Sequence, residues 1–315
     1  MKQKEILLFG ATGQIGRNLI RRLSKDNYKI TAVTRNIHRA GYILKTQANP
    51  GYLDLVEISN LADEKIDLLM RKCSICINLI GILYEKKRDQ FKTIHTDFPD
   101  MLSQKANQYK LDKFIHMSSL GIEKAKDSKY AMSKLDGEKK IIKNFNKYII
   151  LKPSIIYSVD DNFTTNFMSL LNRLPVMPLY YGGKTNFSPI HVIDLVNIIL
   201  EMIKIKEENI ILECIGPEVL SFKEIIQNLL ISLNKKRILF PLPFPIASLT
   251  AKILQLLPKP LLTEDQLKLL KYDNVSSGIY KTNLDIGLET PRIFKSEIDK
   301  YSYNWRTGGQ FSNKL

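Results

Sequence analysis

Three glycines at three-residue spacing are the strongest chemical signal in the sequence. Gly10, Gly13 and Gly16 stand between an apolar run that ends at Phe9 and a segment with helical spacing. Such a turn lets backbone N–H groups and a helix N-terminus face a pyrophosphate, and the third glycine lets the helix pack closely on the strand. The sequence therefore predicts a dinucleotide site built by Gly10, Thr12, Gly13, Gln14, Ile15 and Gly16.

An arginine at the end of the next apolar run indicates which dinucleotide is bound. Arg35 follows the run 30–34, where folds that prefer NAD usually place Asp or Glu to bind the ribose 2′-hydroxyl. A guanidinium donates hydrogen bonds only, so it suits a 2′-phosphate instead. Arg39 lies one helical turn further on. We therefore predict NADP(H) in preference to NAD(H), with an ordinary solvated arginine as the alternative.

A phenol and an ammonium one helical turn apart form the second signal. Tyr130 and Lys134 share a helix face, and Ser118 and Ser119 end a strand at the edge where open α/β sheets keep their sites. A neighbouring cation lowers the pKa of a phenol, which makes Tyr130 a candidate proton donor or acceptor. We predict Ser119, Tyr130 and Lys134 as the catalytic set of an active protein, and Ser118, Tyr130 and Lys134 as cofactor contacts.

Two residues within a nearly uncharged run are further candidates for the cofactor site. Asn78 lies in the run 75–83, where its amide is expected to face the cofactor, and Gly81 permits close backbone approach. No metal site is predicted, because Cys73 and Cys76 have no second cysteine pair and no histidines stand at metal-ligand spacing.

Alternating strands and helices are needed to bring these side chains together. The expected strands are 6–9, 30–34, 53–58, 75–83, 113–117 and 148–151, and the expected helices are 15–23, 63–70, 98–109 and 130–143. This alternation predicts an α/β fold with a Rossmann-type, doubly wound parallel sheet. The regularity weakens further along the chain, so we predict a dinucleotide-binding domain over 1–155 and a smaller C-terminal lobe, 156–315, packed on it.

Composition narrows the class of protein. Of 315 residues, 44% are hydrophobic and 25% charged, which excludes collagen, coiled coil and intrinsic disorder. The net charge of +15 favours anionic partners such as a phosphorylated cofactor, an acidic protein face or anionic lipid. No nucleic-acid motif accompanies it, so nucleic acid is not an expected partner. We expect no targeting segment and no membrane span.

The segment 241–262 has two open interpretations. Its apolar residues recur at helical spacing after a proline-rich entry, and they are Ile246, Leu249, Ile253, Leu256 and Leu257. Lys252 and Lys259 suit anionic headgroups or an acidic partner, which favours a docking helix. A core helix of the smaller lobe is the alternative.

The order of these motifs resembles the short-chain dehydrogenase/reductase superfamily in its extended and atypical branches. It is more closely similar to the NAD(P)-binding accessory subunits of respiratory complex I. The matching stretches cover most of the chain: 10–16, 77–85, 116–121, 130–138, 150–157, 161–163, 177–183, 190–194, 216–220, 262–266 and 273–275. The resemblance adds Pro153 to the cofactor-binding residues. It departs at Ser59 and Asn60, where relatives often carry an Asp that contacts adenine.

The resemblance implies a tightly held NADP(H) and a stabilising role in complex I. The implied partners are complex I subunits and the membrane surface. The implied location is cytoplasmic and peripheral, on the inner face of the plasma membrane or its organellar equivalent. The intact set of Ser119, Tyr130 and Lys134 keeps an alternative open: a free NAD(P)-dependent reductase or epimerase acting on a small or lipid-like substrate.

Overall fold

The computed structural model describes residues 5–243, 246, 248, 262–306 and 308–311. The chain forms two compact units. The first comprises Met1–Ser119, Met132–Lys152 and Leu195–Leu212, and the second Leu120–Ala131, Pro153–Asp194 and Glu213–Leu315. Both units are discontinuous in sequence, and the boundary proposed between residues 155 and 156 as a limit of folding domains stays a prediction.

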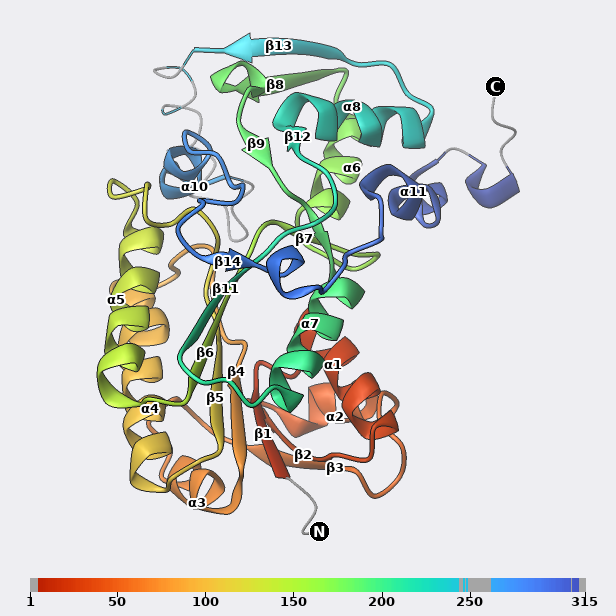
Figure 1. The fold of residues 1–315 in the computed structure, drawn as a ribbon. Helices are drawn as coiled ribbons and strands as arrows, with labels where there is room; N and C mark the ends of the chain where they lie inside the picture. The colour runs from red at the N-terminus through yellow and green to blue at the C-terminus, as the bar shows by residue number, and fades with distance from the viewer. Residues whose placement is uncertain (1–4, 244–245, 247, 249–261, 307, 312–315) are drawn as a thin grey trace. The chain divides into compact units, whose positions relative to one another are not determined.

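The first unit is a parallel sheet with helices on both faces (Figure 1). Its strands are β1 (Glu5–Phe9), β2 (Lys29–Thr34), β3 (Leu53–Glu57), β4 (Ile75–Asn78), β5 (Lys113–Met117) and β6 (Tyr148–Pro153). Its helices are α1 (Gln14–Lys25), α2 (Ile37–Lys45), α3 (Lys65–Lys72), the π-helix η1 (Lys92–Asp97), α4 (Phe98–Gln108), most of α5 (Lys129–Asn144) and most of α7 (Val192–Lys204). Helices α3, α4 and α5 lie along one face, and α1, α2 and α7 along the other.

The strand order is that of a doubly wound sheet. The eight strands run β14-β11-β6-β5-β4-β1-β2-β3, with β11 at Ile210–Cys214 and β14 at Lys281–Thr282. Strands β1 to β6 pair in parallel with their neighbours, and the order reverses between β1 and β4, where Phe9 lies beside Asn78. Ligands of such sheets bind at the carboxyl ends beside this reversal. The predicted α/β class with a Rossmann-type sheet is confirmed.

Burial explains why these residues form these strands. Every residue of β4 and β5 is buried, as expected of central parallel strands covered on both faces. Helix α1 turns Leu19, Ile20 and Leu23 into the core, as its spacing predicted. Phe9 meets Phe98 edge to face with ring centroids 5.3 Å apart. Burial of each such side chain stabilises the fold by about 1.5–3 kcal/mol.

The second unit is built from short elements around its own core. Its strands are β7 (Ile156–Tyr157), β8 (Val176–Tyr180), β9 (Asn186–Phe187), β10 (Ile190–His191), β12 (Leu220–Ser221) and β13 (Ile238–Leu242), paired as β10-β7, β12-β9 and β13-β8. Its helices are α6 (Thr164–Arg173), α8 (Phe222–Leu233), α10 (Glu264–Leu269) and α11 (Phe294–Asp299), with short helices η2 (Tyr181–Gly183), η3 (Leu284–Ile286), η4 (Ser302–Trp305) and η5 (Gly309–Phe311). Tyr157, Met168, Phe222 and Phe294 are buried in its core.

Most of the segment 241–262 lies outside the described residues. These include Leu249, Ile253, Leu256 and Leu257, on which the docking hypothesis depends. Ile246 is described and is 51% exposed. Within the described ranges, no helix is both long and apolar enough to cross a membrane.

Candidate functional site

The glycine turn has the geometry that its spacing predicted. Gly10 has φ of +81°, and a Cβ there would lie 2.9 Å from the backbone carbonyl carbon of Leu79. A Cβ on Gly16 would lie 2.5 Å from the carbonyl oxygen of Gly10, so only glycine lets α1 pack this closely on the turn. A Cβ on Gly13 would meet only the Gly10 carbonyl oxygen, at 3.5 Å. Gly13 is exposed, so its contact with a dinucleotide stays a prediction.

The N-terminus of α1 is suited to an anion. Gly13 is its N-cap residue, no side chain caps it, and its first turn contains no acidic residue. Thr12 is exposed, and Gln14 and Ile15 are half-buried at the start of the helix. The first N–H groups and the dipole of a helix favour a negative group at this end. This part of the structure fits the pyrophosphate of a dinucleotide.

Two exposed arginines follow β2 at its carboxyl end. Arg35 comes directly after the strand, and Arg39 lies in the first turn of α2, where its N–H donates to the Asn36 side chain at 2.8 Å. Among the described residues, neither guanidinium has a hydrogen-bond or ion-pair partner. Both charges are therefore available to a phosphate. Ser59 and Asn60 make local hydrogen bonds: the Ser59 hydroxyl donates to Asp63, and Asn60 Oδ1 accepts from Ala62 N–H.

Asn78 shapes the turn after β4. It is fully buried, its Nδ2 lies 3.2 Å from Nδ1 of His116, and its Oδ1 accepts a hydrogen bond from Ile80 N–H at 3.1 Å. The amide thus orients the backbone that leads to Gly81, so a direct contact of Asn78 with a cofactor stays a prediction. Because an amide N–H can only donate, His116 accepts at Nδ1 and is neutral. Burial, followed by Lys134 and Lys152, lowers the pKa of His116 well below its usual range.

Lys134 is a buried ammonium beside Gly81. Its Nζ donates to the Met117 carbonyl at 2.8 Å, and a Cβ on Gly81 would lie 3.4 Å from that nitrogen. Burial lowers the pKa of Lys134 to about 8; Glu138 opposes this shift and Lys152 adds to it. The residue is therefore still mostly protonated at neutral pH, and its proton is easier to release than that of an ordinary lysine.

Sequence reasoning missed the ion pair that lies behind Lys134. Lys152 is fully buried and donates to both carboxylate oxygens of Glu138 at 2.8 Å, and the Ser118 hydroxyl donates to the same carboxylate. The Ser118 hydroxyl is thus bonded to Glu138 and buried, whereas Ser119 is half-buried. The sequence contained one signal for this ion pair, which is residue spacing. Glu138 lies one helical turn after Lys134, and Lys152 immediately precedes the predicted site residue Pro153.

His95 is a second residue whose position the sequence did not reveal. It lies in the π-helix η1, a rare form that is frequent at functional sites. Its Nε2 accepts from Ile82 N–H at 3.1 Å, so Nδ1 carries the proton and donates to Ser133 Oγ at 3.0 Å. Burial lowers the pKa of His95 to about 2, with Lys134 and His116 contributing. The ring is therefore a neutral link between the turn after β4 and the residue preceding Lys134.

Tyr130 and Pro153 belong to the second unit. Tyr130 lies in the first turn of α5, is 8% exposed, and donates its N–H to Asp265 at 3.0 Å. Helix α5 continues from it to Lys134 in one further turn. Pro153 ends β6, and its carbonyl accepts from Leu120 N–H at 3.0 Å.

The described residues hold no metal-ligand cluster. Nowhere in them do three His, Cys, Asp or Glu side chains come together in a way that could hold an ion. Burial raises the pKa of the Cys73 thiol to about 12 and that of Cys76 well above its usual range. Both thiols therefore stay protonated and unreactive.

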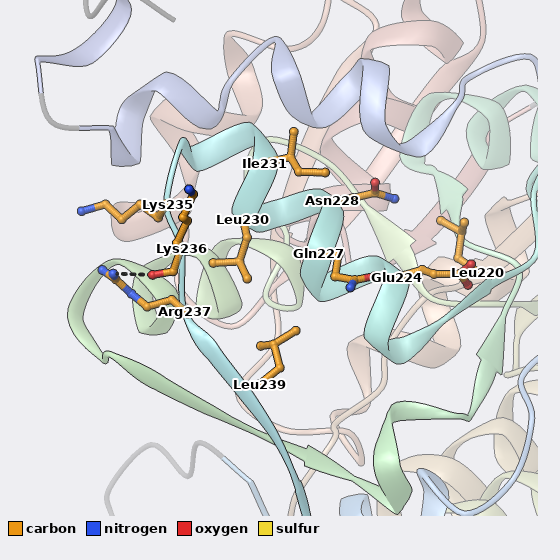
Figure 2. Close-up of a pocket in the computed structure, with 10 residues that line it drawn as sticks. All are labelled: Leu220, Glu224, Gln227, Asn228, Leu230, Ile231, Lys235, Lys236, Arg237 and Leu239. Atoms are coloured by element: carbon orange, nitrogen blue, oxygen red, sulfur yellow. Dashed lines mark hydrogen bonds between the residues drawn. The ribbon is translucent and has the colours of Figure 1, made fainter. Parts of the chain in front are cut away.

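An open groove of about 660 Å³ lies over α8 and β13 in the second unit (Figure 2). Lys235, Lys236 and Arg237 line it together with apolar side chains. The guanidinium of Arg237 donates to the Leu171 carbonyl at 2.8 Å, and Glu224 is bonded within the capping box of α8. None of the predicted site residues lines this groove.

The glycine turn, the reversal of strand order and the uncapped α1 together define an NAD-binding α/β protein. Residues 6–212 match the NAD dependent epimerase/dehydratase family. The chain belongs to this family.

Curated relatives resemble the chain over most of its length. The NADH-ubiquinone oxidoreductase 40 kDa subunit of Neurospora crassa is 24% identical, over 95% of this chain and 77% of its own. NADH dehydrogenase (ubiquinone) 1 alpha subcomplex subunit 9 of Mus musculus is 25% identical, over 92% of this chain and 78% of its own. A ceramide reductase of Caulobacter vibrioides is 26% identical, over 60% of this chain and 57% of its own.

Solved structures share the fold at low sequence identity. UDP-glucuronic acid 4-epimerase of Bacillus cereus, in complex with UDP-glucuronic acid and NAD, has a TM-score of 0.66 at 19% identity and covers 94% of this chain and 99% of its own. MoeE5 in complex with UDP-glucose and NAD has a TM-score of 0.70 at 13% identity, with coverage of 96% and 98%. At these identities the likeness establishes the fold alone.

Proposed function

We propose that this protein is an NADP(H)-holding accessory subunit of respiratory complex I. One observation carries the proposal. Subunits of that complex from Neurospora crassa, Arabidopsis thaliana and Mus musculus match 92% or more of this chain, including the part beyond the family domain.

The first unit supports cofactor retention. The turn 10–16 and the N-terminus of α1 hold the pyrophosphate, and Arg35 with Arg39 holds the 2′-phosphate. Lys134 holds the nicotinamide ribose and is kept in place by the Met117 carbonyl. The bound group supplies hydride-transfer chemistry, whether or not the subunit uses it.

Charge supports a peripheral position on a membrane complex. The net charge of +15 suits acidic faces of neighbouring subunits and anionic lipid headgroups. We place the subunit in the cytoplasm, bound peripherally to the inner face of the plasma membrane, or at the equivalent position in an organelle. The relatives are named as mitochondrial proteins, which favours the organellar position.

A second candidate function is a free reductase that acts on a lipid-like carbonyl. Ser119, Tyr130 and Lys134 are all present, and the low pKa of Lys134 suits proton transfer near neutral pH. The similarity to a ceramide reductase favours this candidate over 60% of the chain. An epimerase is the other activity of this class that the fold accommodates.

Native purification distinguishes the two functions. We expect the tagged chain to migrate with complex I on native gels, with about one NADP(H) per chain released on denaturation. An untagged strain and a tagged unrelated Rossmann protein serve as controls. A chain that migrates alone and oxidises NADPH with a long-chain ketone would overturn the subunit proposal.

A further inference from the structure

We propose that Asp265 and Asn274 are positioning residues for the cofactor site. Asp265 holds the helical turn that contains Tyr130, and Asn274 holds the loops that come after Ser119 and Pro153. Both lie in the stretches 262–266 and 273–275, beyond the family domain that ends at residue 212. The inference rests on the proposed cofactor binding, and it assigns to these two residues the placement of the turn that contains Tyr130 and of the loops after Ser119 and Pro153.

Asp265 caps a helix that begins 136 positions earlier in the sequence. Its Oδ1 accepts from Lys129 N–H at 2.8 Å, and its Oδ2 accepts from Tyr130 N–H at 3.0 Å and from Ser128 Oγ at 2.8 Å. Ser128 Oγ in turn accepts from Ala131 N–H at 3.2 Å. The first N–H groups of α5 are therefore satisfied by one distant carboxylate and one local hydroxyl, and the negative charge suits this helix end.

Asp265 is itself held in place, so it determines where the turn of α5 lies. Thr263 and Gln266 form a capping box at the N-terminus of α10. Thr263 N–H donates to Gln266 Oε1 at 2.9 Å, and Gln266 N–H donates to Thr263 Oγ1 at 3.2 Å. Leu267 is 1% exposed and packs in a small cluster with Tyr180. Figure 1 shows α10 beside the N-terminal end of α5. A displacement of α10 is therefore transmitted to the backbone of Tyr130.

Asn274 ties two further loops together with one amide. Its Oδ1 accepts from Ser154 Oγ at 2.6 Å and from Ile155 N–H at 3.2 Å, and its Nδ2 donates to the Leu120 carbonyl at 2.6 Å. Leu120 comes after Ser119 in the chain, and Ser154 after Pro153. An amide is required, because no carboxylate or hydroxyl offers a fixed acceptor and a fixed donor at opposite sides.

The packing around Gly121 shows that the loop after Ser119 lies directly against the segment 273–275. Gly121 has φ of +76°, and a Cβ there would lie 2.9 Å from the Asp273 carbonyl oxygen. Three of the predicted site positions, Ser119, Tyr130 and Pro153, are thus bonded to this segment directly or through the next residue. Cofactor contacts are sensitive to shifts on the order of 1 Å, so loss of these bonds is expected to weaken binding.

The test compares two carboxylates that cap backbone in similar ways. Asp285 accepts from Thr282 N–H at 2.7 Å and from its hydroxyl at 2.8 Å, but it holds no predicted site residue. We expect Asp265→Ala to weaken NADPH binding by about tenfold, a loss on the scale of a removed cap, while Asp285→Ala changes it by less than about twofold. Asp265→Asn, which keeps an acceptor oxygen, should recover part of the affinity. Hydrogen exchange of residues 128–131 should accelerate only in the Asp265 variants.

A double-mutant cycle shows whether Asp265 acts through Tyr130. In a Tyr130→Phe background, the further loss from Asp265→Ala should fall below about threefold, because the phenol contact is already gone. Asn274→Asp should weaken NADPH binding, since it loses the donor to Leu120. Equal effects of Asp265→Ala and Asp285→Ala, or full additivity with Tyr130→Phe, would overturn the inference. Failure of the wild-type chain to bind NADPH would instead overturn the proposed function.

Discussion

At the scale of single residues, the site depends on buried charges that have exchanged water for specific partners. Lys134, Glu138 and Lys152 are all nearly inaccessible; Lys152 pairs with Glu138, and the charges of both act on Lys134. Such a cluster is costly to bury, and removal of one member of an ion pair typically costs about 3–5 kcal/mol. The buried charges beside Lys134 are therefore kept at a cost in stability, which is common at functional sites.

The low pKa of Lys134 predicts a pH dependence of folding. Its pKa is about 8 in the folded chain, against 10.5 for an ordinary lysine, so the unfolded chain binds more protons between these values. Stability should consequently rise with pH across this window, and the full penalty applies below pH 8. We expect the free energy of unfolding of wild type, relative to Lys134→Met, to increase by about 2 kcal/mol between pH 7.5 and 9.5. Urea titrations without cofactor measure this difference; a constant difference would show that the lysine is not perturbed.

Arg35 predicts the choice of cofactor. A guanidinium bonded to a 2′-phosphate forms charged hydrogen bonds, so Arg35→Ala should weaken NADPH binding by roughly tenfold to a hundredfold. NADH binding should be nearly unchanged, since NADH has no such phosphate. Arg173→Ala, in the last turn of α6, serves as a control for the loss of one positive charge. Titration by nicotinamide fluorescence measures both cofactors, and equal losses for both would contradict this role of Arg35.

At the scale of elements, the sequence predicted the features that local pattern determines. The strand, turn and helix around Gly10–Gly16 and the buried run ending near Asn78 arise from apolar spacing and glycine geometry. The bonds of Asp265 to Lys129 and of Asn274 to Leu120 join residues more than 130 positions apart, and no local pattern specifies them. The π-helix around His95 was also not predicted, and a distant residue packs tightly against it: a Cβ on Gly137 would lie 1.9 Å from the His95 carbonyl oxygen.

The glycine turn allows cofactor contact to be separated from packing. Gly16→Ala places a methyl 2.5 Å from the Gly10 carbonyl oxygen, so it should lower the melting temperature and weaken cofactor binding together. Gly13→Ala meets nothing closer than 3.5 Å, so the unliganded chain should keep its melting temperature while NADPH binding weakens by at least about tenfold. Thermal melts with and without NADPH measure both effects. Unchanged binding in Gly13→Ala would show that the turn does not face the cofactor.

At the scale of the whole molecule, similarity to complex I subunits extends beyond the dinucleotide-binding part of the chain. The family domain ends at residue 212, whereas the match to the Neurospora crassa subunit covers 95% of the chain. The second unit contains Tyr130 with Asp265, which accepts from its N–H, as well as Asn274 and the basic groove at Lys235–Arg237. The match to the ceramide reductase covers 60% of the chain, so the sequence similarity along the whole chain favours the subunit proposal.

The segment 241–262 lies just before α10, and its role in docking can be tested on the whole protein. If it docks on a membrane or on an acidic partner, its apolar residues are not needed for the fold of the isolated chain. Leu249→Glu with Ile253→Glu should then release the protein from membranes and from complex I, while NADPH binding and the melting temperature stay close to wild type. Leu68→Glu, at a position that is 57% exposed on α3, is the control for one added charge on an apolar surface residue. Membrane flotation and native gels measure release. Unfolding of the double variant would instead identify the segment as core, and continued membrane binding by a folded variant would place the contact elsewhere on the protein.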